Sequence, residues 1–588
     1  MEAAVAAASI GASVTLITPV ASRIALMSCN PSLGGIAKGT LVREIDAMGG
    51  VTAISADRTT LQFRMLNMKK GPAVWGPRVQ TDVQEYSREQ RKQLLSAGVS
   101  VVEDTALSLT GPTERITGVR LKSGREILAE GFVLATGTFL GGILHRGEES
   151  WPGGRRGDIS ADALEKDIRR RMFHVKRFKT GTSPRIVRRS VDTSILEEQK
   201  PSEMRFSFSL RSGVPVENTE KCWVTRTTPV TEGIVKESLR HSPLYSGRIT
   251  GKGPRYCPSF EDKVTKFPER TGHPLHLEPL GRSSRIMYLN GLSTSLPQEI
   301  QDRVVRSLPG FRNAEIAAYG YSVEYTCFDT SEFTGTLRLK KTENVYVAGQ
   351  ILGTSGYEEA AATGLLAGAN AARRAMGLSE AQPDRMESYL GVMVDDLVST
   401  GVEEPYRLFS SRSENRLHLR LDNADRRIWR LGEALGTLSG ADRRFFSGRE
   451  RECEQLKVTM EKTRHGESSA AELSRRPGTG AENLAPILGI SSDRDMALLR
   501  SAILDMKYKG YIARAERRQH ALSRYNDVSL EAISDFSLVS SLSTEAVEAL
   551  NGKRPATMGE AGGIPAVRRS DMEALMLYLM KRDVPRGT

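Results

Sequence analysis

The chain has 588 residues, of which 39% are hydrophobic and 26% are charged, and its formal net charge is +12 at pH 7. This length exceeds one ordinary core and predicts two to four domains of a globular protein. No segment has the uninterrupted apolar length of about 20 residues that a bilayer span requires, which argues against a membrane span. The positive charge favours a polyanionic partner, although it serves equally well for solubility or reflects a basic compartment.

The first 18 residues resemble the second half of a βαβ unit. An alanine-rich helix is closed by Gly11 and followed by a strand from Val14 to Thr18. In a dinucleotide-binding fold such a helix follows a buried strand and a GxGxxG turn, whose N–H groups hold the pyrophosphate. Neither precedes this helix. We therefore expect an incomplete N-terminus rather than a secretory signal, because a basic leading segment is lacking and Glu2 is unsuited to one.

Further along, two apolar strands end at turns of small residues. The strand within Arg125–Gly142 ends in Ala135-Thr136-Gly137, and the strand Val345–Ala348 runs into Gly349-Gln350 and a helix rich in alanine and glycine. Such turns let backbone approach a cofactor closely. Between these strands the chain is polar and punctuated by proline, which indicates an inserted domain.

After Leu378 strand signals nearly vanish and helical spacing dominates, while the polar stretch Arg464–Gly480 is typical of a linker. The sequence thus predicts an α/β fold in which a Rossmann-like domain is split by an inserted α+β domain and followed by an α-helical domain. The predicted boundaries are 1–195 and 312–378 for the split domain, 196–311 for the insertion and 379–588 for the helical domain.

Five cysteines are present without a CxxC pair or a cluster of histidines, so no metal site is predicted. Cys222, Cys327 and Cys453 are expected to be buried small hydrophobic residues. Cys29 differs because it lies in the loop MSCNPSLGGIAKGTLVREID, which combines a thiol, two adjacent glycines and Lys38 ahead of an amphipathic helix. Such a loop offers N–H donors and a cation to an anionic ligand, but by itself it is more often an ordinary turn.

That loop, together with KKGPAVWGPRVQTD at residues 69–82, resembles the MnmG/GidA family of tRNA-modifying flavoproteins almost residue for residue. GPAVWG is most similar to the mitochondrial members. The resemblance continues in order through VLATGTFLGG, FKTGTSPR, GKGPRYCPSFEDKV, GLSTSLP, VYVAGQILGTSGYEEAAATG, EPYRLFSSRSENRL, LRLDNAD and YKGYIAR. Matches on so many separate loops are specific, because a shared flavoprotein fold would not reproduce them.

The resemblance implies an FAD-dependent enzyme that acts on tRNA with a MnmE-like GTPase. Such an enzyme places a carboxymethylaminomethyl group, or a taurinomethyl group in mitochondria, on C5 of the wobble uridine. Methylenetetrahydrofolate supplies the carbon, NADH reduces the flavin, and the family acts as a homodimer. The split Rossmann-like domain would then be the FAD-binding domain. We expect a mitochondrial location, with the cytoplasm as the alternative.

The resemblance also implies site residues. Cys29 and Cys257 occupy the two cysteine motifs of the family, and a thiolate there can add to uracil C6 or accept the methylene group. FAD would be held by residues at strand ends and in the Gly157-Asp158 loop, namely Ala106, Gly137, Ser160, Gly349 and Gln350. The nicotinamide segment would include Gly253, Pro254, Arg255 and Tyr256. RNA contacts are expected at Lys69, Lys70, Arg407, Arg412, Arg416 and Arg420, each of which could equally belong to a solvated charged face.

The chain departs from the family pattern at Ala37, Ser183, Leu352, Thr363 and Asn415, positions that bear on flavin and RNA contacts. Two alternatives stay open. One is a TrmFO-like FAD- and folate-dependent tRNA methyltransferase, which would be shorter and would lack YKGYIAR. The other is a non-catalytic tRNA-binding scaffold, made conceivable by the absent phosphate loop and the basic surface.

Overall fold

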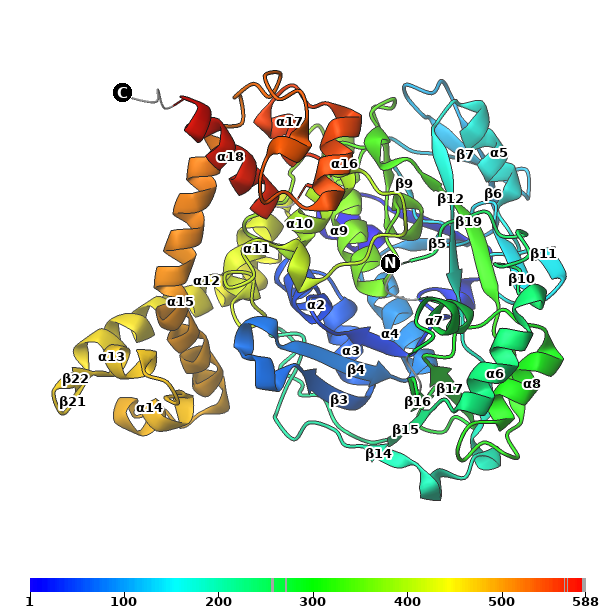
Figure 1. The fold of residues 1–588 in the computed structure, drawn as a ribbon, viewed down its shortest axis with the longest axis horizontal. Helices are drawn as coiled ribbons and strands as arrows, with labels where there is room; N and C mark the ends of the chain where they lie inside the picture. The colour runs from blue at the N-terminus through cyan, green and yellow to red at the C-terminus, as the bar shows by residue number, and fades with distance from the viewer. Residues whose placement is uncertain (255–257, 270–271, 565, 568, 584–588) are drawn as a thin grey trace.

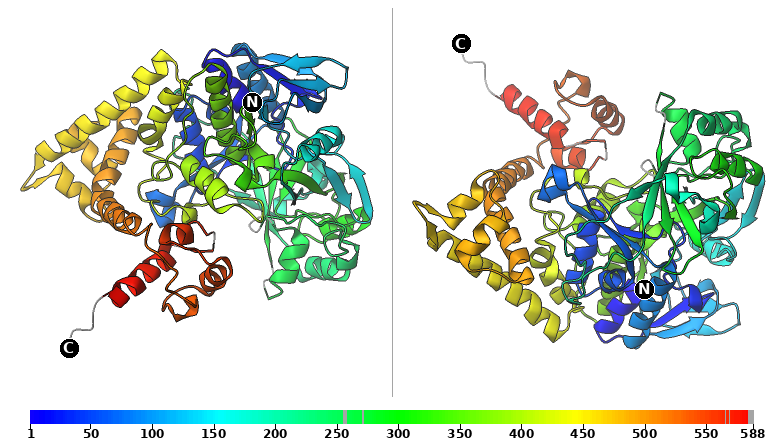
Figure 2. Two further views of the ribbon diagram at one scale, coloured as in Figure 1. Left: turned by 90° about the horizontal axis from the view of Figure 1, so that it is seen from above. Right: turned by 90° about the horizontal axis from the view of Figure 1, so that it is seen from below.

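The computed structural model describes residues 1–588 apart from 255–257, 270–271, 565, 568 and 584–588. An α/β body forms most of the molecule, and the helices after residue 439 extend outward from it (Figure 1). The views from above and below show the same arrangement (Figure 2). None of the described helices is long and apolar enough to cross a membrane.

Two parallel strand pairs lie at the centre of the α/β body. β1 (Thr15–Thr18) pairs with β5 (Ser100–Glu103), and β9 (Phe132–Leu134) pairs with β20 (Val345–Val347). All three residues of β20 are buried, as expected for a parallel strand covered on both faces. Because β9 and β20 are far apart in sequence, the Rossmann-like domain is split, which confirms the predicted fold class.

The chain opens directly with α1 (Glu2–Ser9), which packs on α9 (Tyr357–Ala375). The two helices approach so closely that a Cβ atom at Gly368 would lie 2.1 Å from the carbonyl oxygen of Ala3. Buried Glu2 accepts a hydrogen bond of 2.6 Å from the backbone N–H of Thr52. Its carboxylate thus stabilises the N-terminus of α3 (Thr52–Thr59), where unpaired N–H groups favour an anion.

Two antiparallel sheets extend the body. The first contains β2 (Ser32–Gly34), β4 (Gly76–Thr81) and β3 (Thr60–Leu66), and is flanked by α2 (Lys38–Ala47) and α4 (Val83–Ser96). The second contains β11 (Glu149–Pro152), β10 (Ile143–Arg146), β19 (Ser322–Phe328) and β12 (Val175–Gly181). A smaller meander of β6 (Ala106–Thr110), β7 (Gly118–Leu121) and β8 (Glu126–Leu128) packs against α5 (Asp162–Arg170).

The inserted region is an α+β unit with its own core. Its sheet has the order β14 (Glu197–Gln199), β15 (Cys222–Arg226), β16 (Pro274–Pro279), β17 (Ile286–Asn290), β13 (Arg185–Val187) and β18 (Ile316–Ala318). The accompanying helices are α6 (Pro229–Glu237), α7 (Phe260–Lys266) and α8 (Gln298–Arg306). Since β13 and β18 lie outside 196–311, the sheet extends beyond both predicted boundaries of the insertion.

The last third is helical. α10 (Tyr389–Asp395) and α11 (Ala424–Leu435) pack on α2, and α12 (Gly440–Lys462) leads outward. α13 (Ala470–Arg475), α14 (Ala481–Leu488) and the 31-residue α15 (Asp493–Ser523) share one core, and α16 (Thr544–Lys553), α17 (Met558–Gly562) and α18 (Arg569–Asp583) another. The linker prediction for Arg464–Gly480 is wrong, because a short hairpin and α13 form there and bury Ala470 and Ala471.

Candidate functional site

The candidate site is built on the antiparallel pair of β12 and β19. Phe178 of β12 is paired in register with Tyr325 of β19, and every residue of β19 is buried. Three segments that are distant in sequence meet this pair: the loop that carries Cys29, residues 250–254, and the turn that carries Gln350. The strand pair therefore brings together motifs that the sequence shows only separately.

The Cys29 loop lies over the C-terminal end of β12. The half-buried Cys29 has its Sγ atom 3.8 Å from the carbonyl oxygen of Gly181, and its backbone N–H donates a 2.8 Å hydrogen bond to the hydroxyl of Tyr357. Arg185, at the end of the FKTGTSPR motif, donates to the carbonyl oxygen of Ser28 and stacks on the ring of Tyr288 at 5.2 Å. These contacts hold the thiol between β12 and the start of α9.

Residues 250–254 contact the same strand. The backbone N–H of Lys179 donates to the carbonyl oxygen of Lys252 at 2.9 Å, and a Cβ atom at Gly253 would lie 2.4 Å from Cε of Lys179. Pro254 is buried beside it. The predicted residues Arg255, Tyr256 and Cys257 lie outside the described residues. Residues 250–254, which precede the second cysteine in the sequence, therefore contact the same strand as the Cys29 loop.

Glu324 of β19 anchors this segment. Its Oε1 atom accepts hydrogen bonds from the backbone N–H of Gly251 at 2.6 Å and from the hydroxyl of Thr250 at 2.9 Å. Burial alone would raise the pKa of Glu324, but the nearby His145 at 3.7 Å, the hydrogen bonds from Thr250 and Gly251 and the nearby Arg177 outweigh it and lower the pKa to about 2. The carboxylate is therefore ionised and orders the segment that leads toward Cys257.

The turn after β20 brings Gln350 to the strand pair. Its side-chain amide donates a 2.9 Å hydrogen bond to the hydroxyl of Tyr325. Gly349 has φ = +73°, a conformation that favours glycine, and its N–H donates to the Thr363 hydroxyl at 3.0 Å. Thr363, one of the departures from the family pattern, thus supports this turn.

The end of β9 fits a planar cofactor. Among the described residues, the buried hydroxyl of Thr136 has no hydrogen-bond partner, and a Cβ atom at Gly137 would meet only Phe139, at 3.9 Å. Ser160 is beside this turn, since its hydroxyl donates to the Phe139 carbonyl at 3.2 Å. An unsatisfied buried polar atom beside an open glycine is what a bound ligand with polar edges would complete.

The remaining predicted FAD contacts lie at the edge of this arrangement. Asp158, two residues before Ser160, pairs with Arg155 at 2.6 Å and also with Arg23, the last residue of the short 3-10 helix Ala21–Arg23 that comes after β1. Ala106 lies in β6, opposite Leu121 of β7, and packs against the main core rather than on β12 or β19. The 155–160 loop therefore connects the end of β1 with the turn after β9.

The structure corrects the expectation that Lys38 offers a free cation to an anionic ligand. Lys38 is buried, and its Nζ atom pairs with Glu358 at 3.1 Å and Glu359 at 2.9 Å at the start of α9. The backbone of the glycine-rich loop is also used in a structural contact, because the N–H of Gly34 donates to Glu358 at 2.7 Å. Ala37, where the family has glycine, keeps φ = +63°. The loop thus has a structural role in joining α2 to α9.

The predicted RNA contacts fall into two groups. Lys69, Lys70 and Arg416 are exposed, and Arg407 is partly buried. Arg412 stacks on Tyr406 at 4.2 Å and donates to the carbonyl oxygen of Arg407 at 2.8 Å, which leaves its side chain 35% exposed. Surface cations of this kind remain candidates for phosphate contact.

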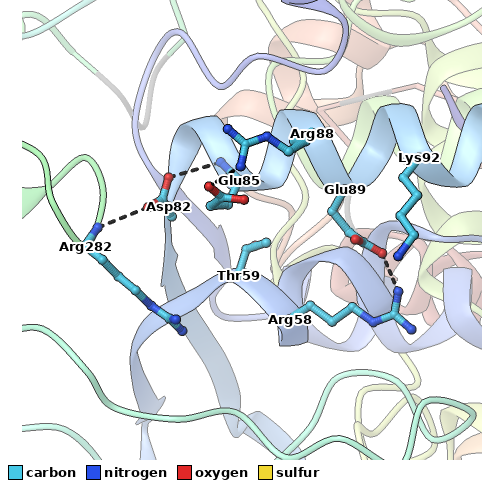
Figure 3. Close-up of a pocket in the computed structure, with 8 residues that line it drawn as sticks. All are labelled: Arg58, Thr59, Asp82, Glu85, Arg88, Glu89, Lys92 and Arg282. Atoms are coloured by element: carbon cyan, nitrogen blue, oxygen red, sulfur yellow. Dashed lines mark hydrogen bonds and ion pairs between the residues drawn. The ribbon is translucent and has the colours of Figure 1, made fainter.

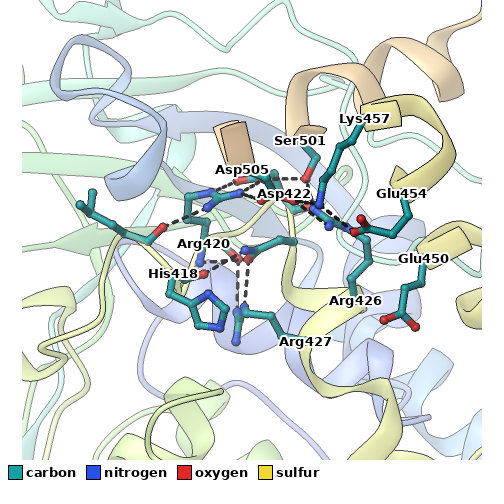
Figure 4. A network of polar contacts seen from close by, with 12 residues as sticks. His418, Arg420, Asp422, Arg426, Arg427, Glu450, Glu454, Lys457, Ser501 and Asp505 are labelled. Carbon is teal, nitrogen blue, oxygen red and sulfur yellow. Dashed lines mark hydrogen bonds and ion pairs between the residues drawn. The ribbon is translucent and has the colours of Figure 1, made fainter. Parts of the chain in front are cut away.

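Arg420 does not belong to this surface, and its assignment to RNA contact is corrected. Its side chain is fully buried and pairs with Asp422 at 2.9 Å and with Asp505 of α15 at 2.5 Å. Asp505 also pairs with Arg426 at 2.9 Å and Lys457 at 2.8 Å, which makes it the centre of the network in Figure 4. The network ties α15 to the region of α11 and α12. The buried guanidinium was not recognisable from the sequence because one of its two carboxylate partners, Asp505, lies 85 residues away.

Two surface hollows lie away from the candidate site. One, of about 1070 Å³, borders the Asp505 network. The other, of about 360 Å³, is shown in Figure 3 and is lined by Arg58, Thr59, Asp82, Glu85, Arg88, Glu89, Lys92 and Arg282. Its charged groups are largely paired with one another, for example Arg88 with Glu85 at 2.5 Å. Neither hollow is lined by Cys29 or Gln350.

Sequence reasoning missed three residues that shape the site: Glu324, Tyr325 and Tyr357. Tyr357 lies within the matched segment VYVAGQILGTSGYEEAAATG, so the motif was available but its hydroxyl contact was not foreseeable. Glu324 and Tyr325 lie on a strand that the pattern left unmarked. Only the pairing of β12 with β19 reveals their position.

Comparison with known proteins places this arrangement in a family. A family model described as glucose inhibited division protein A matches residues 1–379, and one described as the tRNA modifying enzyme MnmG/GidA C-terminal helical bundle matches residues 518–586. The tRNA uridine 5-carboxymethylaminomethyl modification enzyme MnmG of Chlamydia felis is 41% identical over 589 residues, covering 99% of this chain and 96% of that protein. Its counterpart in Chlorobium luteolum is 39% identical over 607 residues, covering 98% of this chain and 97% of that protein.

Solved structures agree. Aquifex aeolicus GidA in its form II crystal superposes with a TM-score of 0.84 at 37% identity, covering 98% of this chain and 96% of that one. The form I crystal gives the same TM-score at 38% identity, covering 98% and 97%. The relatives named here are bacterial, so the resemblance to mitochondrial members finds no support in them. The chain belongs to the MnmG/GidA family.

Proposed function

We propose that this chain adds a carboxymethylaminomethyl group to C5 of a tRNA uridine, the modification that its relatives' name describes, and that it does so with FAD at the wobble position. The observation that carries the proposal is the convergence of Cys29, residues 250–254 and Gln350 on β12 and β19. A half-buried thiol, the segment that precedes the second cysteine and a strand-end turn suited to a flavin meet at one place. Membership of the MnmG/GidA family supports a common reaction for these elements.

Bound FAD would supply redox chemistry for the one-carbon unit. The residues that fit it are the turn after β9, with Thr136 and Gly137, and the turn after β20, where Gln350 is held by Tyr325. The side chains of Gln350 and Thr136 would hold polar edges of the flavin ring.

The two cysteines would carry the covalent chemistry on the base. A thiolate that adds to C6 of uracil makes C5 a nucleophile, and a thiol can also accept a methylene group. Cys29 is held over the end of β12, and Cys257 follows a segment anchored by Glu324. Which thiol performs which step stays a prediction.

Partners follow from the family and from charge. The exposed cations Lys69, Lys70 and Arg416, with Arg407 and Arg412, would contact tRNA phosphates. Methylenetetrahydrofolate as carbon donor, NADH as reductant through the segment around Gly253, a MnmE-like GTPase and a homodimeric state are proposed on the same resemblance. The bacterial relatives favour the cytoplasm as the location.

The test is complementation of a bacterial strain that lacks its own enzyme, with tRNA nucleosides measured by mass spectrometry. Wild type and Cys453→Ser are expected to restore the modified wobble uridine, because Cys453 is buried far from the site. Cys29→Ser and Cys257→Ser are expected to abolish it while FAD, measured by flavin absorbance of the purified proteins, stays bound. Full modification by either serine variant would contradict the assigned chemistry.

The two alternatives are also separated. A TrmFO-like methyltransferase is disfavoured because the C-terminal helical bundle of the MnmG/GidA family matches residues 518–586. Its activity would appear as a methylated uridine outside the wobble position in the same measurement. A non-catalytic scaffold would bind tRNA without flavin and would be indifferent to both cysteine substitutions.

A further inference from the structure

The backbone of Cys29 and Asn30 is held from one side by a single buried hydroxyl. The N–H of Cys29 donates to the hydroxyl oxygen of Tyr357 at 2.8 Å, and the N–H of Asn30 donates to the same atom at 3.3 Å. Tyr357 is the first residue of α9, whose position is fixed by the buried contacts of Lys38. Burial raises the pKa of Tyr357, so the hydroxyl stays neutral at physiological pH.

A second set of contacts holds the loop from the other side. The side-chain oxygen of Asn30 accepts from the hydroxyl of Ser32 at 2.8 Å and from its N–H at 3.1 Å. Arg78 donates to the Ser32 hydroxyl at 3.0 Å and to Glu278 at 3.2 Å. Glu278 is buried in β16 of the inserted sheet and also accepts from Asn290. The relay therefore reaches from the thiol loop into the inserted region.

From this geometry we infer that Tyr357 is a positioning residue that sets the height of the Cys29 thiol above β12, with the Asn30–Ser32–Arg78 relay as its second support. The inference rests on the proposed function only because that function makes Cys29 a reacting group. Two N–H groups on one oxygen fix two consecutive peptide planes, and a peptide plane that is fixed leaves the thiol few orientations. A nucleophile needs a fixed position, because a displacement of about 1 Å can lower the reaction rate roughly a hundredfold.

The perturbation is Tyr357→Phe, which keeps the ring and removes the acceptor. The two N–H groups must then find water, and the loop is expected to rise from β12 and expose Cys29. The matched control is Tyr346→Phe, because Tyr346 is a buried tyrosine whose hydroxyl donates to Glu380 at 2.6 Å, away from this loop. Ser32→Ala tests the second support with a smaller change.

The first readout is the alkylation rate of Cys29 by iodoacetamide in the reduced, FAD-supplemented protein between pH 6.5 and 9, followed by peptide mass spectrometry. Tyr357→Phe is expected to label at least about threefold faster at each pH, and Ser32→Ala faster by a smaller factor. Bound flavin should match wild type, and kcat for wobble modification should fall about tenfold with little change in KM. Tyr346→Phe should match wild type in all of these.

Labelling and kcat equal to wild type in Tyr357→Phe would overturn the inference. Loss of flavin together with faster labelling at Cys29 in both tyrosine variants would also overturn it, since it would mean general loosening. If Tyr357→Phe does not fold, unchanged labelling in Ser32→Ala overturns the inference. Because labelling needs no tRNA, a chain that modifies no tRNA would refute the proposed function while the labelling comparison still decides the role of Tyr357.

Discussion

Asp505 of α15 is the residue on which the attachment of the helical part depends. Its carboxylate contacts Arg420 at 2.5 Å, Arg426 at 2.9 Å and Lys457 at 2.8 Å. Burial alone would raise the pKa of Asp505, but Arg426 and Arg420 outweigh it and hold the pKa well below its ordinary value. Asp505→Asn removes the charge and leaves three neighbouring cations in place.

The magnitude follows from burial. Removing one partner of a buried ion pair costs about 3–5 kcal/mol, because the remaining charge is left uncompensated. The side chain of Asp505 is 19% exposed and Arg420 keeps Asp422, so we expect the lower end, about 3 kcal/mol. The control is Asp493→Asn, whose pair with Arg205 is 74% exposed on the Asp493 side and should contribute at most about 1 kcal/mol.

The assay is native-state hydrogen exchange, because a multidomain chain does not unfold in one step. Peptides from α12 and α15 should exchange about a hundredfold faster in Asp505→Asn, which corresponds to about 3 kcal/mol. Peptides from β12 and β19 should be unaffected, as should every peptide in Asp493→Asn. Equal protection of α15 in wild type and Asp505→Asn would refute the reasoning that this network anchors the helix.

Three further outcomes are expected. Lys38→Ala should lower the free energy of opening of α2 and the start of α9 by about 3–5 kcal/mol, measured by native-state hydrogen exchange, because two buried glutamates lose their cation; a loss below about 1 kcal/mol would contradict this structural role. Burial raises the pKa of Asp57 to about 7 despite hydrogen bonds from two backbone N–H groups, so its stabilising contribution is complete below about pH 4 and is lost as pH rises through 7. The free energy of unfolding of wild type should therefore fall more between pH 5 and 8 than that of Asp57→Asn. Parallel curves of this free energy against pH would exclude the raised pKa of Asp57. Arg416→Ala should weaken tRNA binding in a filter assay and reduce the salt slope by about 1, whereas an unchanged slope would remove Arg416 from the RNA surface.

Local pattern was sufficient for much of the fold. The alanine-rich opening, the small-residue turns at Gly137 and Gly349, and the helical spacing after Leu378 each depend on neighbours in sequence, and each forms as expected. The family was identified from the literal sequences of the loops, and the comparisons confirm it over nearly the whole chain. The stretch Arg464–Gly480 was misassigned as a linker, because its polar composition does not reveal the buried pair Ala470 and Ala471 in α13.

The roles of charged residues could not be read from the sequence. Lys38 and Arg420 are residues of the type that binds phosphate, yet both are buried in ion pairs. The glutamates that pair with Lys38 are more than 300 residues away in sequence. Whether a cation faces solvent or a carboxylate depends on long-range packing, and no local pattern encodes it. Arg416, four residues before Arg420, remains exposed.

The sequence by itself therefore determined the split α/β fold and the helical C-terminal part, which follow from periodicity and from glycine-containing turns, and the family, which follows from the literal resemblance of its loop sequences. Only the tertiary structure decided which motifs meet. The pairing of β12 with β19 brings Cys29, Gly253 and Gln350 to one place, and the start of α9 supplies the hydroxyl that holds the thiol loop. The physical reason is that a catalytic arrangement is a set of contacts between distant segments, fixed by burial and hydrogen bonding once the sheets have formed.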